Sequence, residues 1–278
     1  SLNSLAKVTR DSSTAKILGI TGSVGKTTLK NLISFTLKNY GKVCSSPHSY
    51  NNKFGVPFSL SNLKKNTKYG VFEIGMDKKG EIDNLSKIVK PEIGVITNIS
   101  GAHFKNFNTL KDIAKAKAEI LNNIVESGTV ILNKDDKFFD FFSNKAKKNK
   151  INVVSFSSKK KADVFLSNIK KINKHYRIKV IVKKKHFYFD VPYCADNFIS
   201  NILACIAVLN VLNLNLIKIN KKFKNFNIPS GRGDAKTVKK FKKKFKFIDE
   251  SYNANPLSVN SALKNFDLIK QDSSKKHL

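Results

Sequence analysis

The sequence predicts an α/β fold: a P-loop parallel sheet flanked by helices, with a small β-rich edge and the start of a second, Rossmann-like α/β domain. In the first half of the chain, apolar runs of strand length alternate with segments of helical periodicity. A glycine-rich turn joins the first apolar run to the first helical segment. We expect strands at residues 16–21, 69–74, 93–98, 129–133 and 152–156, and helices at 26–39, 80–89, 110–125 and 137–148.

The alternation of strands and helices ends near residue 162. Hairpins at one edge of the sheet are predicted by β-rich runs at 164–169, 176–182 and 186–191, followed by a helix at 198–212. Two further strands are expected at 235–238 and 245–249, before a helix that begins near Pro256. We therefore predict a nucleotide-binding domain at 1–228 and the truncated start of another α/β domain at 229–278.

The net charge of +32, from 52 basic and 20 acidic residues, would by itself indicate a nucleic-acid partner. However, the arginines are few: Arg10, Arg177 and Arg232. Nucleic-acid readers usually rely on arginine for bidentate contacts. Lysine together with abundant Asn, Ile and Phe is the composition that an AT-rich genome encodes. We interpret the lysines as solvated surface and expect no nucleic-acid partner.

The cysteines and the apolar segments indicate where the protein resides. Cys44, Cys194 and Cys205 are odd in number and widely spaced, which fits reduced thiols better than a disulfide or metal framework. The most apolar stretch, 202–209, is too short to cross a bilayer. We expect a cytoplasmic monomer without a membrane span. Because the only methionine is Met76 and nothing closes the C-terminus, we also expect a fragment.

The segment Thr21–Thr28, TGSVGKTT, has the context of a P-loop between a strand and a helix. In such a loop, backbone N–H groups surround phosphate oxygens, the ammonium of Lys26 reaches the terminal phosphates, and the hydroxyl of Thr27 binds Mg²⁺. The strict motif has glycine where Ile20 stands, and Gly22 lies inside the loop instead. The segment predicts binding of a nucleoside triphosphate.

Two further side chains lie at the predicted carboxyl edge of the sheet. Glu73 ends an apolar strand and could hold Mg²⁺ there, or could be a solvent-exposed glutamate at a strand end. His103 follows the strand-like run 94–99, and its alternative is a surface or capping role. Both are candidates for the same site.

Lys117 lies at the centre of an apolar helical stripe. At about 100° per residue, the apolar side chains of segment 110–124 share its face, whereas Lys115 points the opposite way. A lysine in that position must extend to solvent, pair with a carboxylate, or be neutralised or inverted chemically. We expect it to be functional or paired.

Several polar residues have both a binding and a structural interpretation. The amides of the turn-rich loop 51–57 could bind a ligand or cap the next helix. Asn197 and Asn201, one helical turn apart, could contact a purine edge or act as caps. Arg232, between two glycines, could reach a phosphate from a moving domain or form a salt bridge.

Eight segments together resemble the Mur ligase family, and the resemblance covers essentially the whole chain. They are ITGSVGKTT (20–28), NNKFGVP (51–57), FEIG (72–75), TNISGAH (97–103), AKAKAEI (114–120), DNFISNILA (196–204), GRG (231–233) and DESYNANP (249–256). The last segment is the most specific, to the family member that adds D-alanyl-D-alanine to a UDP-MurNAc-tripeptide. The family's P-loop also lacks the first glycine, as here at Ile20.

The resemblance implies a role for each candidate residue. The ATP phosphates would be bound by Gly22, Ser23, Val24, Gly25, Lys26, Thr27 and Thr28. Two Mg²⁺ ions are implied, one held by Thr27 and Glu73 and the second by His103 with Glu73 nearby. Lys117 matches a lysine that the family carbamylates with CO₂, which gives an anion that supports the metal site.

The remaining implied contacts are to the nucleotide and the substrate. Asn197 and Asn201 would contact adenine, although Asp196 stands where the family usually has histidine. Arg232 would contact the ATP phosphates, and the nucleotide would also be lined by Tyr252, Asn253 and Asn255. Asn51 and Asn52 would face the UDP-substrate.

The implied activity is ATP-dependent amide bond formation through an acyl phosphate in peptidoglycan precursor synthesis, with Lys26, Glu73, His103 and Lys117 as the catalytic set. The family's N-terminal domain and most of its C-terminal domain would lie outside the sequence, so we expect these residues alone to bind ATP weakly and not to ligate. The alternatives are another Mur or folylpolyglutamate-type ligase, which segment 252–256 argues against, a nucleic-acid-dependent P-loop ATPase, or an inactive scaffold.

Overall fold

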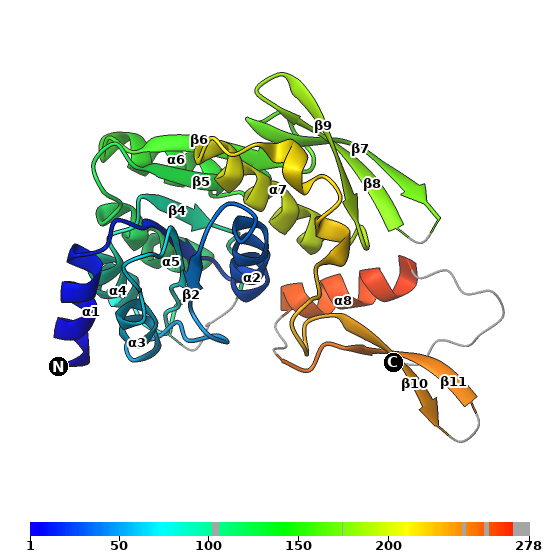
Figure 1. Ribbon diagram of the computed structural model, residues 1–278, viewed down its shortest axis with the longest axis horizontal. Coiled ribbons are helices and arrows are strands. Elements are labelled where there is room, and N and C mark those ends of the chain that lie inside the picture. Colours follow the sequence, from blue (N-terminus) through cyan, green and yellow to red (C-terminus); the bar gives the residue numbers. More distant parts are fainter. Residues whose placement is uncertain (102–105, 174, 241–242, 253–255, 269–278) are drawn as a thin grey trace.

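A nine-stranded sheet organises the chain in the computed structural model, which describes residues 1–101, 106–173, 175–240, 243–252 and 256–268 (Figure 1). The strand order is β2-β3-β1-β4-β5-β6-β7-β8-β9. The strands are β1 (Lys16–Thr21), β2 (Val43–Ser45), β3 (Tyr69–Glu73), β4 (Ile93–Ile96), β5 (Thr129–Asn133), β6 (Asn152–Ser157), β7 (Val164–Ile172), β8 (His175–Val182) and β9 (Lys185–Val191).

The sheet is parallel from β2 through β7 and antiparallel from β7 to β9. The fold class predicted from the sequence, a parallel sheet with a β-rich edge, is confirmed. The edge runs continue the sheet as neighbouring strands. The central strands β3 and β4 are buried throughout, because helices cover both faces of a parallel sheet.

The helices divide between the two faces of the sheet. One face packs against α2 (Lys26–Leu37) and α7 (Asp196–Val211). The other face is covered by α1 (Leu2–Asp11), α3 (Gly55–Ser61), α4 (Glu81–Val89), α5 (Leu110–Lys117) and α6 (Phe139–Lys148). Short 3₁₀ helices occur at Ala118–Asn122, Leu216–Ile219 and Phe223–Asn225. The parallel sheet therefore lies between two layers of helices, and the carboxyl ends of its strands form one edge between these layers.

Several predicted elements end earlier than expected, including the strand that precedes Asn98 and the helix that carries Lys117. The strand predicted to reach residue 98 ends at Ile96, and the helix predicted over 110–125 is α-helical only to Lys117 before a 3₁₀ segment begins. The carboxylate of Glu119 in that segment accepts hydrogen bonds from the backbone N–H groups of Gly80 and Asp83, at 2.8 and 3.1 Å. These bonds to the start of α4 accompany the change of helix type.

The last part of the chain forms a hairpin and a helix. Strands β10 (Asp234–Lys240) and β11 (Lys243–Asp249) pair antiparallel with each other in a separate two-stranded sheet, and α8 (Pro256–Leu268) follows. Figure 1 shows the hairpin and α8 together, away from the large sheet. The expected strands and the helix start at Pro256 are present, whereas the domain boundary at 228/229 stays a prediction.

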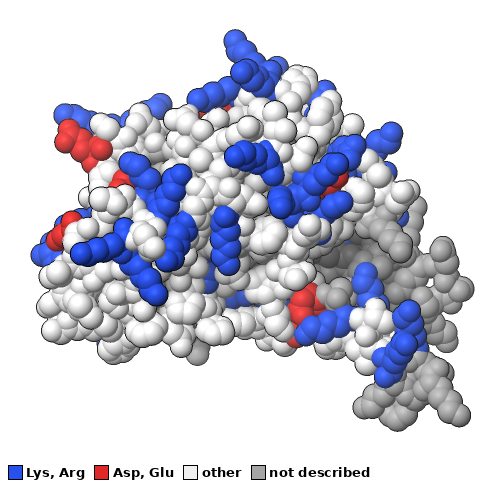
Figure 2. Space-filling view, in the orientation of Figure 1, with Lys and Arg blue, Asp and Glu red and all other residues white. Residues whose placement is uncertain are grey.

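On the visible face, lysine and arginine side chains are scattered among uncharged residues and do not gather into one stripe (Figure 2). This spread supports the interpretation of the charge as solvated surface. Among the described residues, no helix combines the length and apolar character needed to cross a bilayer.

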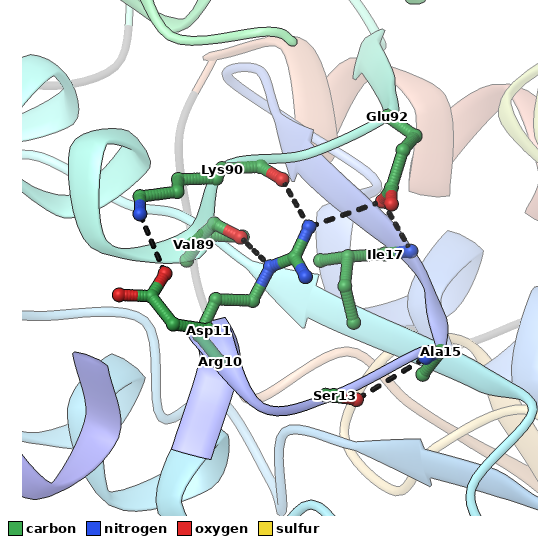
Figure 3. A network of polar contacts seen from close by, with 8 residues as sticks. All are labelled: Arg10, Asp11, Ser13, Ala15, Ile17, Val89, Lys90 and Glu92. Atoms are coloured by element: carbon green, nitrogen blue, oxygen red, sulfur yellow. Dashed lines mark hydrogen bonds and ion pairs between the residues drawn. The ribbon is translucent and has the colours of Figure 1, made fainter. Parts of the chain in front are cut away.

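Arg10 fixes α1 to the rest of the fold, and this helix was not among those predicted from the sequence. The exposed apolar side chains of α1 point outward, whereas Ala6 and Arg10 are buried. The guanidinium donates at 2.8 Å to the carbonyls of Val89 and Lys90, which end α4, and lies 3.4 Å from the Glu92 carboxylate (Figure 3). Glu92 in turn accepts from the N–H of Ile17 in β1, at 2.7 Å. One cation thus satisfies carbonyls that the helix itself leaves free.

We expect Arg10→Met to lower the free energy of unfolding by about 2 kcal/mol, because it leaves the carbonyls at the end of α4 and the partly buried Glu92 without their partner. Urea unfolding followed by circular dichroism measures the change. Lys7→Met, at an exposed position of the same helix, is the control and should change it little. Equal effects of the two substitutions would contradict this role.

Candidate active site

The P-loop connects β1 to α2 and is bound to the segment that follows β4. The N–H of Ser23 donates to the carbonyl of Asn98 at 2.9 Å, and the N–H of Val24 donates to the Asn98 side-chain oxygen at 3.0 Å. The hydroxyl of Thr97 donates to the carbonyl of Val24 at 2.7 Å. The loop is therefore held in shape by the protein itself, which reduces the ordering cost of binding an anion.

Two glycines give the loop its path. Gly22 has φ +144° and Gly25 has φ +87°, a region that favours glycine. A Cβ atom on Gly22 would lie 1.9 Å from the Thr97 hydroxyl oxygen. Ile20, in contrast, is fully buried in β1 and packs into the core on the α2 face. Position 20 thus belongs to the strand, which explains why the loop does not need glycine there.

Thr27 and Glu73 meet at the carboxyl edge of the sheet. The register of β1 and β3 pairs Ile20 with Glu73, so the carboxylate lies beside the P-loop. The Thr27 hydroxyl donates to Glu73 Oε2 at 2.8 Å, and Asn51 Nδ2 donates to Oε1 at 2.8 Å. Glu73 is 1% exposed, so the alternative of a solvated strand end is wrong.

Lys26 lies over the P-loop. Its ammonium donates to the carbonyls of Gly22 at 2.8 Å and Ser23 at 3.4 Å. Burial lowers the pKa of Lys26; the negative charge of Glu73 opposes this shift, and the positive charge of Arg232 adds to it. Lys26 and Arg232 thus place two positive side chains near the P-loop, with the Glu73 carboxylate also close enough to act on Lys26.

Arg232 reaches this site from the C-terminal hairpin. Its guanidinium stacks on the Tyr252 ring at 3.8 Å and donates to the Ser49 hydroxyl at 3.1 Å. Ser49 Oγ lies 3.2 Å from Thr27 Oγ1. Arg232 therefore lies near the P-loop through a hydroxyl contact, and the expected contact of Arg232 with a phosphate stays a prediction.

Lys117, the last residue of α5, is 1% exposed. Its pKa is lowered well below the ordinary value of 10.5, first by burial and second by the like charge of Lys26. Extension to solvent is thus excluded, and the charged group acting on it is a cation. Of the alternatives that the sequence left open, the neutral or chemically modified amine fits this environment best.

The asparagines predicted to bind ligands occupy different surroundings. Asn201, 6% exposed, has its amide 3.0–3.2 Å from where a Cβ on Gly25 would lie, so it packs against the P-loop. Asn52 uses its side-chain oxygen to cap α3, accepting from the N–H groups of Phe54 and Gly55 at 3.1 and 2.9 Å. His103, Asn253 and Asn255 lie outside the described residues.

A cleft of about 1700 Å³ joins these groups. It lies between the large sheet's carboxyl edge and the C-terminal hairpin with α8. The predicted site residues on its walls are Ser23–Thr28, Asn51, Asn52, Glu73, Asn197, Asn201, Arg232 and Tyr252. Lys117 is not among the described residues that line the cleft, but it is close enough to Lys26 for the charge of Lys26 to act on it. The sequence analysis missed Ser49 and Asn98, whose contacts depend on how the strands are placed.

No group of three or more His, Cys, Asp or Glu side chains that could hold a metal occurs within the described ranges. Thr27 and Glu73 nevertheless bring together a hydroxyl and a carboxylate, the kinds of oxygen ligand that suit a Mg²⁺ ion shared with a triphosphate. A magnesium site that borrows phosphate oxygens does not need a cluster of protein ligands.

The Mur ligase middle domain profile matches residues 20–209, which is more than half of the chain. The chain belongs to the Mur ligase family. This membership explains why the P-loop, Glu73 and α7 occur together, since all lie within the matched range. The predicted family is confirmed.

Relatives and solved structures agree with this assignment. The UDP-N-acetylmuramoyl-tripeptide–D-alanyl-D-alanine ligase of Buchnera aphidicola subsp. Baizongia pistaciae is 34% identical over 95% of this Mur ligase and 56% of its own length. The structure of MurF from Acinetobacter baumannii matches with a TM-score of 0.87 at 29% identity, and the match covers 97% of this chain and 58% of that protein. The structure of MurF ligase from Thermotoga maritima in complex with ADP matches with a TM-score of 0.79 at 25% identity, and the match covers 95% of this chain and 60% of that protein. The chain spans little more than half the length of these proteins.

We expect Gly22→Ala to destabilise this Mur ligase by more than about 2 kcal/mol, because it adds a steric clash to the cost of a positive φ. Gly80→Ala is the matched control. Gly80 has φ +88° but no atom within 4 Å of the added Cβ, so only the backbone cost of about 1 kcal/mol applies. Urea unfolding of both variants measures the difference, and equal losses would contradict the packing of Gly22 against Thr97.

We expect Lys117→Met to raise the free energy of unfolding at neutral pH in buffer free of CO₂. The unfolded chain binds more protons at this side chain than the folded chain between the lowered pKa and 10.5, so wild-type stability rises with pH through that window. The free energy of unfolding of the variant does not rise in this way, so the difference in stability between the variant and the wild type becomes smaller at alkaline pH. Unfolding curves across the range test this, with exposed Lys115→Met as control. Parallel profiles of the variant and the wild type would contradict it.

Proposed function

We propose that this Mur ligase chain is part of an ATP-dependent, ADP-forming ligase that adds D-alanyl-D-alanine to UDP-MurNAc-tripeptide in peptidoglycan precursor synthesis in the cytoplasm. The observation that carries the proposal is the convergence of Lys26, Thr27 and Glu73 on one cleft. The choice of substrate rests on the relatives: proteins named UDP-N-acetylmuramoyl-tripeptide–D-alanyl-D-alanine ligase match nearly the whole of this chain.

The residues present fit ATP and magnesium. The loop from Gly22 to Thr28 offers N–H groups at the start of α2, and Lys26 adds a partly buried positive charge. Thr27 and Glu73 would hold one Mg²⁺, and His103 would help to hold a second. Magnesium would neutralise phosphate charge during transfer. Asn197 and Asn201 are proposed for adenine, with Tyr252, Asn253 and Asn255 completing the nucleotide site.

Lys117 fits a carbamate formed with CO₂. Carbamylation requires a neutral amine, and burial lowers the pKa of Lys117 in the direction that favours one. Strand alternation places the Thr21 side chain on the α5 face of the sheet, and its buried hydroxyl has no hydrogen-bond partner among the described residues. That hydroxyl is a donor suited to an anion on the same face.

The chain's own residues would then position the reactants. Lys26 and Arg232 draw the terminal phosphate into place, while Asn51 and Thr27 hold the Glu73 carboxylate still. The tripeptide carboxylate attacks the γ-phosphorus of ATP, and ADP leaves as an acyl phosphate forms. The amine of D-alanyl-D-alanine attacks the acyl carbon, loses a proton and expels phosphate. Asn51 and Asn52 would face the UDP-substrate.

We expect Glu73→Gln to weaken Mg²⁺-dependent ATP binding at least about tenfold, because the amide keeps the shape but removes the negative charge that the metal requires. Fluorescence titration with a labelled ATP measures this, and exposed Glu126→Gln is the control. Unchanged affinity would remove Glu73 from the metal site.

The reaction itself is tested on a version that includes the flanking coding sequence. Phosphate release should require both UDP-MurNAc-tripeptide and D-alanyl-D-alanine, and Lys117→Ala should abolish it. Release stimulated by nucleic acid in place of these substrates would contradict the proposed function, as would full turnover with the Lys117 variant.

A further inference from the structure

Lys30 is a buried lysine on α2, one turn after Lys26, and the reaction proposed above does not use it. The side chain is 1% exposed. Its ammonium donates to the carbonyl of Ser46 at 2.7 Å and to the carbonyl of His48. Both acceptors belong to the turn Ser46–Ser49 between β2 and α3. A buried cation is thus used to hold a short turn.

The turn Ser46–Ser49 is hydrogen-bonded to β3, the strand that carries Glu73. The N–H of Ser46 donates to the carbonyl of Val71 at 3.1 Å, and the Ser46 hydroxyl accepts from the N–H of Glu73 at 3.2 Å. His48 has φ +42°, which is uncommon for a residue other than glycine and has to be stabilised by its surroundings. The bond from Lys30 to the His48 carbonyl supplies such a constraint.

The far end of the turn presents Ser49 to the P-loop. Thr27 gives its hydroxyl proton to Glu73, so Ser49, 3.2 Å away, must donate to Thr27. Ser49 in turn accepts from Arg232 at 3.1 Å. A directed chain of hydrogen bonds therefore runs from the Arg232 guanidinium through two hydroxyls to the Glu73 carboxylate. Such chains polarise each member and strengthen one another.

We propose that Lys30 is a positioning residue for the magnesium and phosphate site: its ammonium holds the turn Ser46–Ser49 so that Ser49 lies between Arg232 and Thr27. The proposal rests on the proposed function, because it concerns the same Mg²⁺–nucleotide site. Lys30 touches neither the P-loop glycines nor Glu73 through any hydrogen bond in the described part, and acts through the turn.

The ammonium, and not the bulk of the side chain, carries this role. A side chain without donors would leave the buried carbonyl of Ser46 unsatisfied and release His48 from its φ.

The test is the Mg²⁺ dependence of nucleotide affinity in Lys30→Met, which keeps the length of the side chain and removes its donors. The protein is titrated with labelled ATP, once in the presence of Mg²⁺ and once in the presence of EDTA. The measured quantity is the dissociation constant in EDTA divided by the dissociation constant in Mg²⁺, and it is compared with that of the wild type. We expect this ratio to fall at least about tenfold, whereas affinity in EDTA, which depends on the P-loop itself, changes little. Lys38→Met, exposed at the end of the same helix, should keep the wild-type ratio.

Ser49→Ala keeps the test decisive if Lys30→Met does not fold, as judged by circular dichroism. It leaves the Lys30 contacts in place, removes the middle of the hydrogen-bond chain, and should lower the same ratio. The double variant should lose no more than Lys30→Met alone, because both act through one turn. A wild-type ratio in Lys30→Met or in Ser49→Ala, or an equal loss of ATP affinity with and without Mg²⁺, overturns the role of Lys30 but leaves the proposed function in place. A wild-type chain that binds no nucleotide overturns the proposed function as well.

Discussion

The hydrogen bond from Thr27 to Glu73 is the contact on which the site depends. Thr27 lies in α2, after strand β1 and the P-loop, and Glu73 ends the neighbouring parallel strand β3. The pairing of Ile20 with Glu73 in these two strands brings Thr27 and Glu73 together. Because Glu73 is 1% exposed, water cannot solvate its charge, and protein donors or cations must do so. The polar groups around it are therefore mutually dependent: loss of one donor exposes the cost of burying the carboxylate.

The charges around this contact do not balance within the described site. Positive charge from Lys26, Lys30 and Arg232 surrounds Glu73, and burial lowers the pKa of both lysines. A ligand with several negative charges would offset the excess at the place where loop N–H groups also point. This local excess, rather than the chain's net charge of +32, is the electrostatic feature that supports the proposed phosphate-rich ligand.

The sequence predicted what depends on local repetition and missed what depends on strand placement. Helical periodicity located Lys117 correctly, because the repeat fixes which face a side chain occupies. It could not identify Ser49, whose partners come from α2 and the hairpin, nor α1, whose stability rests on Arg10 bonded to a distant helix end. The 3₁₀ turn after Lys117 was likewise unpredictable, since the bonds of Glu119 are to α4.

Arg232 makes the electrostatics of the P-loop sensitive to the position of the C-terminal hairpin. Gly231 and Gly233 flank it with φ +74° and +92°, and a Cβ on Gly231 would lie 3.0 Å from the Cβ of Tyr252. The guanidinium stacks on Tyr252, so the two side chains support each other beside the hairpin. The hydrogen bond from Arg232 to Ser49 joins this part of the chain to the turn beside the P-loop. Since the charge of Arg232 lowers the pKa of Lys26, moving it away would weaken the positive field at the loop, and an anion held by both would oppose that movement.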